Sequence, residues 1–481
     1  MAKIQSGIVV GAAPVSLDID VPGSKVSGTV TVNGAAISGA AKGAGSLRLV
    51  TAAGDATELT GTSTSGGSYS ALVVPGSYDL YYGESSAGTS VPSNTSAKLQ
   101  SGIVVGSAPL ALDVNISATA VSGSFTINGA TVASAIEQQG SLTLANAAGD
   151  QAPLGTYSAA TGSYSGRVVP GTYDLYWSGS GADVPSNRSA KIQTGIVVGS
   201  SALVLDVDLL ASTVSGTVTI NGATDSALGN GISYLTLRGA AGDTAPITVS
   251  SAGSYSARVM PGTYDLYYGS KDAPLNVGAR NVAAKIQSGI VVGASALTLN
   301  INVPVSTVSG NVAINGAAAS APGKNAFLLH LRNAAGDSAL IASFPQGSYS
   351  ASVVPGNYDL YYTKQGNGGL EIPSNIPAKI RSGIVVGSLP LSLDVDVPGS
   401  IVSGTITVNG VPNAGSSGDL GFVALLDAEG NASSLTSASS GMGTYSAFVV
   451  PGRYELYYLL YRGGPTIPSN SHFHLGCFIV P

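Results

Sequence analysis

Apolar and polar residues alternate along short runs of this chain, and turn-forming residues separate the runs. Residues 121–128, Val-Ser-Gly-Ser-Phe-Thr-Ile-Asn, show the pattern, and the Asn128-Gly129 pair favours the positive backbone dihedrals of a tight turn. Further runs of this kind lie at 141–145, 163–169, 172–177, 190–198 and 203–208. Period-two alternation is typical of half-buried strands, and we find no segment with the 3.6-residue period of a helix. Six or seven short strands, spaced by about 8–12 residues, predict an all-β fold of the antiparallel sandwich type.

The whole set of runs recurs along the chain. The motif Ala-Lys-Ile-Gln-Ser-Gly-Ile-Val-Val-Gly is repeated almost unchanged, and a degraded copy covers 473–480. Its lysines are Lys3, Lys98, Lys191, Lys285 and Lys379, spaced by 93 to 95 residues. A solenoid unit repeats every ~20–50 residues, whereas a unit of this length can bury a core of its own. The repeat therefore predicts a tandem array of about five like domains, which we call modules.

Each module is expected to begin at a Val-Ser-Gly sequence and to end at a Leu-x-Leu-Asp-x-Asp strand. The boundaries that follow are 26–120, 121–213, 214–307, 308–401 and 402–481 for modules 1 to 5, with residues 1–25 holding the last two strands of an incomplete module. Joints between modules, such as 209–213, are about five residues long. Because such joints are too short for free tumbling, we expect neighbouring modules to abut as a semi-rigid rod.

Composition narrows the class of protein further. Only 10% of residues are charged, the net charge is −6, and glycine occurs 65 times. A negative balance without clustered Lys and Arg argues against nucleic-acid binding. No apolar run reaches the ~18 residues of a membrane span, so none is expected. The lone Cys477 cannot form an internal disulfide.

The order of the elements resembles that of a known family. The segments that carry this resemblance are Val-Ser-Gly-Thr-Val-Thr-Val-Asn-Gly (26–34), Gly-Ser-Tyr-Ser (67–70), Val-Pro-Gly-Ser-Tyr-Asp-Leu-Tyr-Tyr (74–82) and Leu-Ala-Leu-Asp-Val (110–114). They resemble bacterial carboxypeptidase-regulatory-like modules, which are transthyretin-like or Cna-B-like sandwiches (Ig-like in general form) found in tandem on large surface proteins. The resemblance covers every module and implies fold and tandem use. Its motifs are structural and carry no catalytic residues.

Two groups of polar residues are candidate sites. Asp206 and Asp208 lie on one strand face and could bind Ca²⁺, but the fourth copy of this strand carries Asn300 and Asn302 instead. A solvated strand face is the simpler interpretation. Cna-B-like domains can carry isopeptide crosslinks from lysine, which would need a buried lysine beside an acid. The alternation instead points Lys98 and its equivalents outward, where lysines oppose edge-to-edge aggregation.

Metal and cofactor chemistry has little support in the sequence. His472 and His474 have strand spacing, but only one other histidine and one cysteine occur, so we expect no metal site and no cofactor. No nucleophile elbow, zinc signature or phosphate loop is present, and the glycines fall at strand turns. We therefore expect the protein not to be an enzyme.

One tyrosine per module points outward at the same offset. These residues are Tyr81, Tyr176, Tyr267, Tyr361 and Tyr457. They could bind a sugar or peptide, pack against a neighbouring subunit, or cover the sheet locally.

The two ends of the sequence complement each other. Module 5 stops at Pro481, where its closing strand should begin, while residues 1–21 carry strand sequence that belongs to no complete module. A strand from another chain can fill such a slot. In residues 15–21 the alternation places four apolar side chains on one face, namely Val15, Leu17, Ile19 and Val21. We expect this segment to complete module 5 of the next subunit, giving a head-to-tail homopolymer.

These features together predict a non-catalytic structural protein. Tandem like domains extend reach, and Ser, Thr and Gly on the surface resist nonspecific contact. We expect an extracellular or cell-surface fibre or stalk subunit of a bacterium. The alternative is an adhesin whose outward tyrosines hold a carbohydrate or matrix-protein ligand.

Overall fold

A computed structural model describes residues 23–36, 45–59, 67–84, 91–131, 140–156, 162–181, 183–224, 233–250, 252–270, 278–319, 326–343, 347–365, 371–405, 407–408, 411–412, 420–435, 444–462 and 473–480. These residues form strands and turns, and none of them lies in a helix, so the all-β prediction is confirmed. No helix in this part of the chain could therefore span a bilayer.

Module 2 shows the architecture, which is a sandwich of two sheets. The first sheet contains β11 (Ala130–Thr131), β10 (Thr119–Ile127), β14 (Ser163–Val168), β17 (Leu203–Val204) and β18 (Val207–Leu209). The second sheet has the order β13 (Gln151–Thr156), β12 (Gly140–Ala145), β15 (Gly171–Gly179) and β16 (Ala190–Val198). All pairings in the second sheet are antiparallel. The chain thus places its first and last strands together in one sheet.

Modules 1, 3 and 4 repeat this topology. Module 1 comprises β1 (Ser24–Val32), β2 (Ala35–Ala36), β5 (Ser68–Val73), β8 (Leu110–Ala111) and β9 (Val114–Ile116), facing β4 (Ala56–Glu58), β3 (Ser46–Val50), β6 (Gly76–Gly83) and β7 (Ala97–Val105). Module 3 comprises β19 (Ser212–Ile220), β22 (Ser254–Val259), β25 (Leu297–Thr298) and β26 (Ile301–Val303), facing β21 (Thr244–Ile247), β20 (Ser233–Gly239), β23 (Gly262–Ser270) and β24 (Ala284–Val292). Module 4 comprises β28 (Ala317–Ala318), β27 (Ser306–Ile314), β31 (Ser348–Val353), β35 (Leu391–Ser392) and β36 (Val395–Val397), facing β30 (Ser338–Ser343), β29 (Ala326–Arg332), β32 (Gly356–Gln365) and β34 (Ala378–Val386).

Module 5 differs in its first sheet. In the described part of this module, β37 (Ser400–Thr405) pairs only with β42 (Thr444–Val449), beside a short pair of β38 (Thr407–Val408) and β39 (Val411–Pro412). Its second sheet has the order β33, β41, β40, β43 and β44, with bounds Asn375–Ile376, Ala432–Ser434, Leu420–Leu426, Gly452–Arg462 and Phe473–Val480. Strand β33 comes from the segment that follows β32 of module 4, so a strand of one module extends a sheet of the next.

The closing strands depart from the predicted antiparallel pairing, because they run parallel to the first strand of their module. In module 2, β17 and β18 run parallel to β10, with Val121 opposite Leu203 and Phe125 opposite Val207. Gly123 lies between these two contacts, and a Cβ there would overlap the carbonyl oxygen of Leu205. The Val-Ser-Gly motif therefore has glycine where a closing strand approaches the first strand most closely.

Local sequence explains the turns and the core. Asn128 (φ 53°) and Gly129 (φ 76°) adopt the predicted positive dihedrals after β10. Along β10, residues alternate between buried and more exposed positions up to a central irregularity. Each module has its own cluster of buried apolar side chains. In module 2 the cluster contains Trp177, whose ring stacks on Phe125 with centroids 5.1 Å apart.

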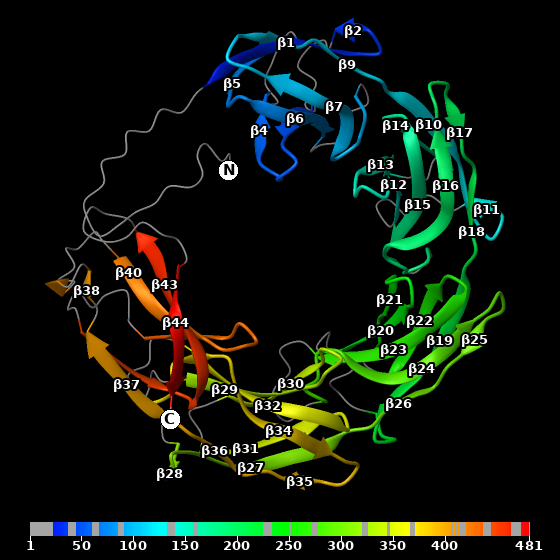
Figure 1. Cartoon of the computed structure of the whole chain (residues 1–481). Helices are drawn as coiled ribbons and strands as arrows, with labels where there is room; N and C mark the ends of the chain where they lie inside the picture. Colours follow the sequence, from blue (N-terminus) through cyan, green and yellow to red (C-terminus); the bar gives the residue numbers. More distant parts are fainter. Residues whose placement is uncertain are drawn as a thin grey trace.

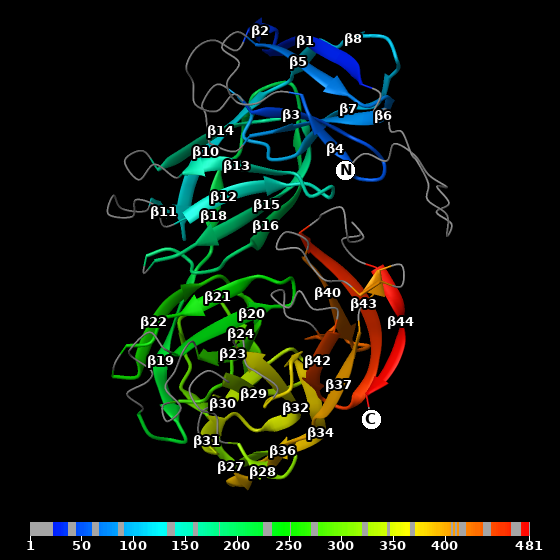
Figure 2. The ribbon, with the colours of Figure 1, turned by 90° about the vertical axis from the view of Figure 1, so that its left-hand side faces the viewer.

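The modules follow one another along a curved path rather than a straight rod (Figure 1). Strands of the second sheets, such as β12, β20 and β29, lie toward the inside of the arc, and strands of the first sheets lie toward the outside. Modules 1 and 5 occupy the two ends of the arc and do not meet in either view (Figures 1 and 2).

Candidate functional site: the joints between modules

Each joint is built from a segment that leaves one module and packs against the next. We call residues 91–96, 184–189, 278–283 and 372–377 the joint segments. The first joint segment starts at Val91, which is buried in the core of module 1. The hydroxyl of Tyr82 donates to the carbonyl of Pro92 at 2.8 Å. The corresponding aromatics of modules 2 to 4 also donate to a backbone carbonyl of their joint segment: the Trp177 indole N–H to Pro185 (3.0 Å), and the hydroxyls of Tyr268 to Ala279 (3.3 Å) and of Tyr362 to Pro373 (2.7 Å). The segment is thus fixed firmly to its own module.

The backbone of the joint segment bridges the two sheets of the following module. The Ser93 N–H donates to the carbonyl of Arg167 at the end of β14, at 2.9 Å. Two residues later, the Thr95 N–H donates to the carbonyl of Gln151 in β13, at 2.8 Å. Because β14 and β13 belong to different sheets, the segment closes one open side of the sandwich. It also supplies partners to strand edges that would otherwise be open to pairing with other chains.

A buried asparagine lies at the centre of the first joint. Asn94 is fully buried, and its side-chain amide donates to the carboxylate of Asp150 at 2.6 Å and to the hydroxyl of Tyr173 at 3.2 Å. The Val169 N–H donates to the amide oxygen of Asn94 at 2.8 Å. The Ser96 N–H donates to the other carboxylate oxygen of Asp150 at 2.8 Å. Both ends of the asparagine side chain are therefore satisfied, as a buried amide requires.

The next two joints repeat this arrangement. A fully buried asparagine again donates to an aspartate and to a tyrosine hydroxyl of the following module. The pairs are Asn187 with Asp243 (3.2 Å) and Tyr264 (3.0 Å), and Asn281 with Asp337 (2.5 Å) and Tyr358 (3.0 Å). In both joints a backbone N–H, from Met260 or Val354, donates to the amide oxygen at 2.8 Å. The joint is thus a repeated structural unit.

The fourth joint keeps the asparagine and changes its acceptor. Asn375 donates to the hydroxyl of Tyr454 at 3.0 Å and accepts from the Val450 N–H at 2.8 Å. Asn431 occupies the position that is aspartate in the other modules. The Ser374 hydroxyl lies 2.6 Å from that of Ser433 in the next module, which adds a contact at this joint.

Apolar contacts reinforce the hydrogen bonds. Val169 belongs to module 2 but packs in the core of module 1. Val354 and Val450 likewise pack in the cores of modules 3 and 4, and Met260 packs against that of module 2. Each of these residues precedes a Pro-Gly turn. The turn therefore inserts an apolar side chain into the preceding module.

The Pro-Gly-x-Tyr motif holds that turn in place. The hydroxyl of Tyr173 donates to the carbonyl of Val169, four residues earlier, at 2.8 Å. Burial raises the pKa of Tyr173, and it raises the pKa of the equivalent Tyr358 to about 12. These hydroxyls therefore remain protonated and able to donate at neutral pH.

The motif lysines lie on the surface in ion pairs. Lys98 lies 2.6 Å from Asp79 on the neighbouring strand β6, and both side chains are partly exposed. The equivalent pairs are Lys191 with Asp174 (2.8 Å), Lys285 with Asp265 (2.7 Å) and Lys379 with Asp359 (3.5 Å). Hydrogen bonding to the lysine lowers the pKa of Asp79 and raises that of Lys98. The outward orientation matches the sequence prediction and differs from the buried site that an isopeptide crosslink needs.

The outward tyrosines are half-buried on the same sheet face. The guanidinium of Arg238 lies over the ring of Tyr267 at 4.1 Å, and that of Arg332 lies over Tyr361 at 4.7 Å. The hydroxyl of Tyr361 also donates to Glu429 of module 5 at 3.2 Å. Tyr81, Tyr176 and Tyr457 are half-buried as well, and Lys191 lies 5.6 Å from the ring of Tyr176. The rings of Tyr267 and Tyr361 thus pack against arginine side chains of the neighbouring strands, and Tyr361 also contacts the next module.

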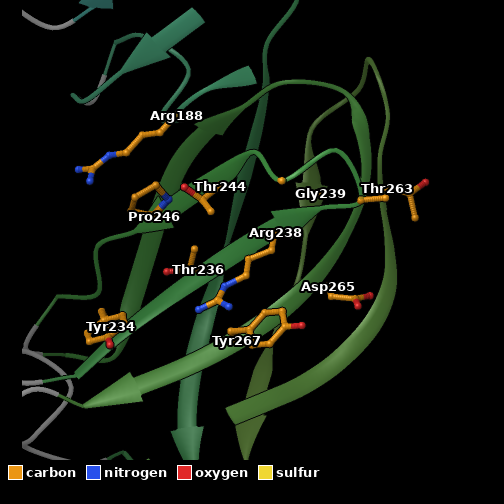
Figure 3. A pocket seen from close by; sticks show the side chains of 12 residues that line it. Arg188, Tyr234, Thr236, Arg238, Gly239, Thr244, Pro246, Thr263, Asp265 and Tyr267 are labelled. Atoms are coloured by element: carbon orange, nitrogen blue, oxygen red, sulfur yellow. The ribbon is translucent and has the colours of Figure 1, made fainter. Parts of the chain in front are cut away.

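A groove of about 870 Å³ lies beside one of these tyrosines. Tyr234, Arg238 and Tyr267 line it from module 3, and Arg188 of the second joint segment borders it (Figure 3). Arg238 and Tyr267 lie together on the wall of this groove, while Arg188 lies at its border. The groove thus places one of the outward tyrosines, Tyr267, on the wall of a hollow in module 3.

The paired acidic residues of the closing strands have a structural role. Asp208 accepts hydrogen bonds from the Thr126 hydroxyl (2.8 Å) and the Gly129 N–H (2.9 Å), and Asp206 accepts two from Ser124. In module 3, Asn302 accepts the same pair of bonds through its amide oxygen. An acceptor oxygen is what this position requires, which explains why Asp and Asn interchange. No group of three metal-binding side chains occurs in the described part of the chain.

Some predicted residues lie outside the described part of the chain. These are Val15, Leu17, Ile19 and Val21, together with His472 and the side chain of His474. The joint asparagines are the functional residues that sequence reasoning missed. A signal was present for three of the four, since Val-Pro-Ser-Asn ends at Asn94 and Asn187 and Ile-Pro-Ser-Asn ends at Asn375, whereas Asn281 follows Gly-Ala-Arg.

Known proteins resemble this chain in structure but not in sequence. No family model matches the chain, and no curated protein sequence matches it significantly. Among solved structures, the Bacillus anthracis TIE protein is similar over 73% of this chain and 66% of its own, with 14% identity and a TM-score of 0.15. A streptococcal ancillary pilin is similar over 55% of this chain and 95% of its own, with 9% identity and a TM-score of 0.18.

Two B repeat units of the Staphylococcus aureus collagen-binding protein are also similar to this chain. They match over 77% of this chain and 99% of their own, with 9% identity and a TM-score of 0.15. Scores this low do not identify a shared function.

Proposed function

We propose that this protein is a non-catalytic structural protein of a bacterial cell surface, a stalk or fibre subunit that spans distance through a chain of interlocked modules. The observation that carries the proposal is the repeated joint, in which a buried asparagine and a buried backbone segment fix each module to the next. Four consecutive joints, each with a buried asparagine that bonds to a tyrosine of the next module, would hold the array of small domains in a constant shape.

Electron microscopy and small-angle scattering of the purified chain test this proposal. We expect a curved array of five beads of constant shape, with a scattering curve that the arc in Figure 1 reproduces. A chain whose modules tumble independently would contradict it. So would detection of the chain only in the cytoplasm after fractionation of the source cells.

Polymerisation by strand donation is the finer part of the proposal. In modules 1 to 4 a tyrosine hydroxyl donates to the closing strand, as Tyr349 does to the Leu393 carbonyl at 2.6 Å. Module 5 has the corresponding tyrosine, Tyr445, and the corresponding glycine, Gly404, but β37 has no parallel partner in the part described. We propose that residues 15–21 of a second copy supply this strand, with the Leu17 carbonyl accepting from Tyr445. Burial of the four apolar side chains would contribute about 1.5–3 kcal/mol each before entropy costs.

A pair of matched variants tests strand donation. Leu17→Asp places a charge on the face that would be buried, whereas Ser16→Asp places the same charge on the face that would remain wet. We expect the first to abolish filaments in negative-stain images and the second to leave them unchanged. Equal behaviour of the two variants, or filaments after deletion of residues 1–21, would show that this segment does not join copies.

An adhesin is the second candidate function, and the groove beside Tyr267 favours it. Aromatic rings with adjacent guanidinium groups suit a sugar ring or an acidic peptide. A glycan and matrix-protein array tests this function. Binding that is lost in Tyr267→Ala and Tyr361→Ala, while Tyr176→Ala retains it, would support a ligand site on modules 3 and 4. An array without specific binding would contradict it.

A further inference from the structure

We propose that the groove of module 3 is a binding site for a saccharide that carries carboxylate groups, such as a uronate oligosaccharide. The inference rests on the adhesin function, the second candidate above, and deepens it. It narrows the ligand site from modules 3 and 4 to module 3 alone, and it names the chemical class of the ligand. It does not depend on the stalk function or on strand donation.

The outer face of the second sheet forms the wall of the groove. Tyr234, Thr236 and Arg238 alternate along β20 with buried leucines, so they share the outer face of the sheet. Tyr267 of β23 lies opposite Thr236 in the register of the two strands. The groove has a volume of about 870 Å³, which is in the range of ligand-binding pockets.

Two arginines of the groove have no acidic partner. Among the described residues no carboxylate pairs with Arg188 or Arg238, and both side chains are exposed. The carboxylate that lines the groove, Asp265, is already paired with Lys285 at 2.7 Å. The guanidinium of Arg238 lies over the ring of Tyr267 at 4.1 Å, which holds the planar group in one orientation (Figure 3). The groove therefore has positive charge that an anionic ligand can neutralise.

Module 3 is also the only module with a positive net charge in the sequence. Modules 1, 2 and 5 are negative, and module 4 is neutral. Residues 214–307 contain five basic and four acidic residues, namely Arg238, Arg258, Lys271, Arg280, Lys285, Asp225, Asp243, Asp265 and Asp272. An acidic polymer is therefore repelled least by this part of the chain.

The lining of the groove suits a sugar. The hydroxyl groups of Thr236, Thr244 and Thr263 line it, and hydroxyls can both donate to and accept from those of a saccharide. The ring of Tyr234 is 38% exposed, and its hydroxyl donates to the Val282 carbonyl at 2.8 Å. This bond holds the ring in place, so that its exposed face can pack against a pyranose ring.

An acidic peptide is a poorer match to the same groove. Extended peptides commonly bind by adding a strand to a free sheet edge. The edge strand beside the groove is β21, and the second joint segment already pairs with it. The Arg188 N–H donates to the Thr244 carbonyl at 2.7 Å, and the Thr244 N–H donates back at 3.2 Å. The groove therefore offers side chains to a ligand, and its nearest strand edge is occupied at this point.

The other modules lack this combination of residues. The position of Arg238 is held by Val50, Ala145, Arg332 and Leu426 in modules 1, 2, 4 and 5. The position of Arg188 is held by Thr95, Val282 and Ile376 in the other joint segments. Only module 4 thus keeps an arginine over its outward tyrosine, and it has no second arginine in the joint segment.

In module 4 a carboxylate from the next module contacts that tyrosine. Glu429 of module 5 pairs with Lys379 at 2.7 Å and accepts from the Tyr361 hydroxyl at 3.2 Å. Ala335 has the same place in the turn of module 4, where its N–H makes the same bond within the turn (3.0 Å, against 2.9 Å for Glu429). The joint that follows module 3 therefore brings a methyl group, and no carboxylate, to this position beside Tyr267.

A panel of acidic saccharides tests the proposal. Fragments of polygalacturonate, alginate, hyaluronan and polysialic acid are titrated against the full chain, each beside its methyl-esterified form. We expect at least one acid form to bind, its ester to bind about tenfold or more weakly, and added salt to reduce the affinity, because the carboxylates contact the arginines. Absence of binding by every acid form, or equal binding of acid and ester, would overturn the proposal.

Arginine variants locate the site. Arg238→Ala removes an exposed side chain, and we expect the affinity to fall by about tenfold or more. Arg238→Lys should give an intermediate loss, since it keeps the charge but not the planar fork. Arg332→Ala removes the equivalent arginine of module 4 and is the matched control. Equal affinities of Arg238→Ala and Arg332→Ala would overturn the assignment to module 3.

A second variant leaves the groove residues in place. Ala335→Glu copies Glu429 of the following joint and should bring a carboxylate to Tyr267, which repels an acidic ligand. We expect about a tenfold loss of affinity with an unchanged melting temperature, because the residue lies in an exposed turn. Ala148→Glu, at the same position in the turn of module 2, is the matched control. Unchanged affinity in Ala335→Glu would show that the acid binds elsewhere.

Two further probes separate this inference from the adhesin function itself. A polyglutamate peptide that binds as tightly as the saccharides, with the same loss in Arg238→Ala, would replace the saccharide with an acidic peptide. A neutral glycan that binds and is lost in Tyr267→Ala, in the absence of any acidic binder, would support the adhesin function and overturn the acidic ligand. Absence of all binding would contradict both, while the shape of the array still tests the stalk function.

Discussion

The side-chain amide of Asn94 lies 2.6 Å from the carboxylate of Asp150, a residue 56 positions later that belongs to the next module. Both side chains are almost completely buried. A buried carboxylate is costly unless hydrogen-bond donors surround it, and here the donors come from the preceding module. The two modules therefore stabilise each other through a contact that neither could satisfy alone.

Loss of the joint asparagine should release one module from the next. We expect Asn94→Ala to weaken the first joint by about 1–3 kcal/mol, because Asp150 and Tyr173 lose a buried partner. Asn94→Asp should have a larger effect, since it places a second carboxylate against Asp150. Hydrogen exchange of residues 91–96 measures the change, with Ser107→Ala in an exposed turn as the control. Unchanged protection in Asn94→Ala would show that the apolar contacts suffice.

The glycine of the Val-Ser-Gly motif should be intolerant of a methyl group. Gly123→Ala would force the new Cβ against the Leu205 carbonyl and displace the closing strand of module 2. We expect a loss of about 1–3 kcal/mol, as for other overpacked sites. Gly199→Ala is the matched control, because no atom lies within 4 Å of its added Cβ. Thermal unfolding of the two variants should differ clearly, and equal melting would contradict this account of the motif.

The closing-strand carboxylates should be replaceable by amides. We expect Asp208→Asn to change stability by less than about 0.5 kcal/mol, since Asn302 makes the same contacts in module 3. Asp208→Ala should cost about 1 kcal/mol, because Thr126 and Gly129 lose their acceptor. A calcium chelator should leave the melting temperature unchanged. A lower melting temperature in chelator would indicate a bound cation at this strand.

The buried tyrosines should make the fold sensitive to strong alkali. Burial raises the pKa of Tyr358 from 10.0 to about 12, so the folded state holds this proton more tightly than the unfolded state. The resulting stability is complete below pH 10 and is lost as the pH rises toward about 12. Tyrosinate absorbance and circular dichroism should therefore change together in one cooperative step. The chain in urea is the control, and its tyrosines should titrate near their ordinary pKa.

Module 4 should also weaken in acid. Burial, together with the charges of Arg332 and Arg280, lowers the pKa of His330 to about 4. The folded state thus favours the neutral ring, and its contribution to stability is present above pH 6.5 and is lost as the pH falls toward about 4. His330→Thr, which copies Thr236 of module 3, should remove this dependence. Hydrogen exchange of modules 3 and 4 across this range measures it, and equal acid sensitivity of the variant would exclude His330 as the cause.

The sequence by itself determined the strands, the turns and the existence of the repeat. Period-two alternation depends only on the geometry of an extended chain, and Asn128-Gly129 reaches positive dihedrals for reasons local to those two residues. The outward position of Lys98 follows from the same alternation. These features could be predicted because each depends on neighbours in the chain.

Only the tertiary structure decided how the modules are joined and that their path is curved. The contact of Asn94 with Asp150 and Tyr173 forms between side chains 56 and 79 residues apart, which no local pattern specifies. The same is true of the parallel pairing of β18 with β10, which brings the two ends of a module together. From the sequence alone, the asparagine of Val-Pro-Ser-Asn cannot be distinguished from an ordinary turn residue, because its burial depends on the tertiary structure. A buried amide is stable only when it is hydrogen-bonded, and the groups that bond to this amide belong to the next module.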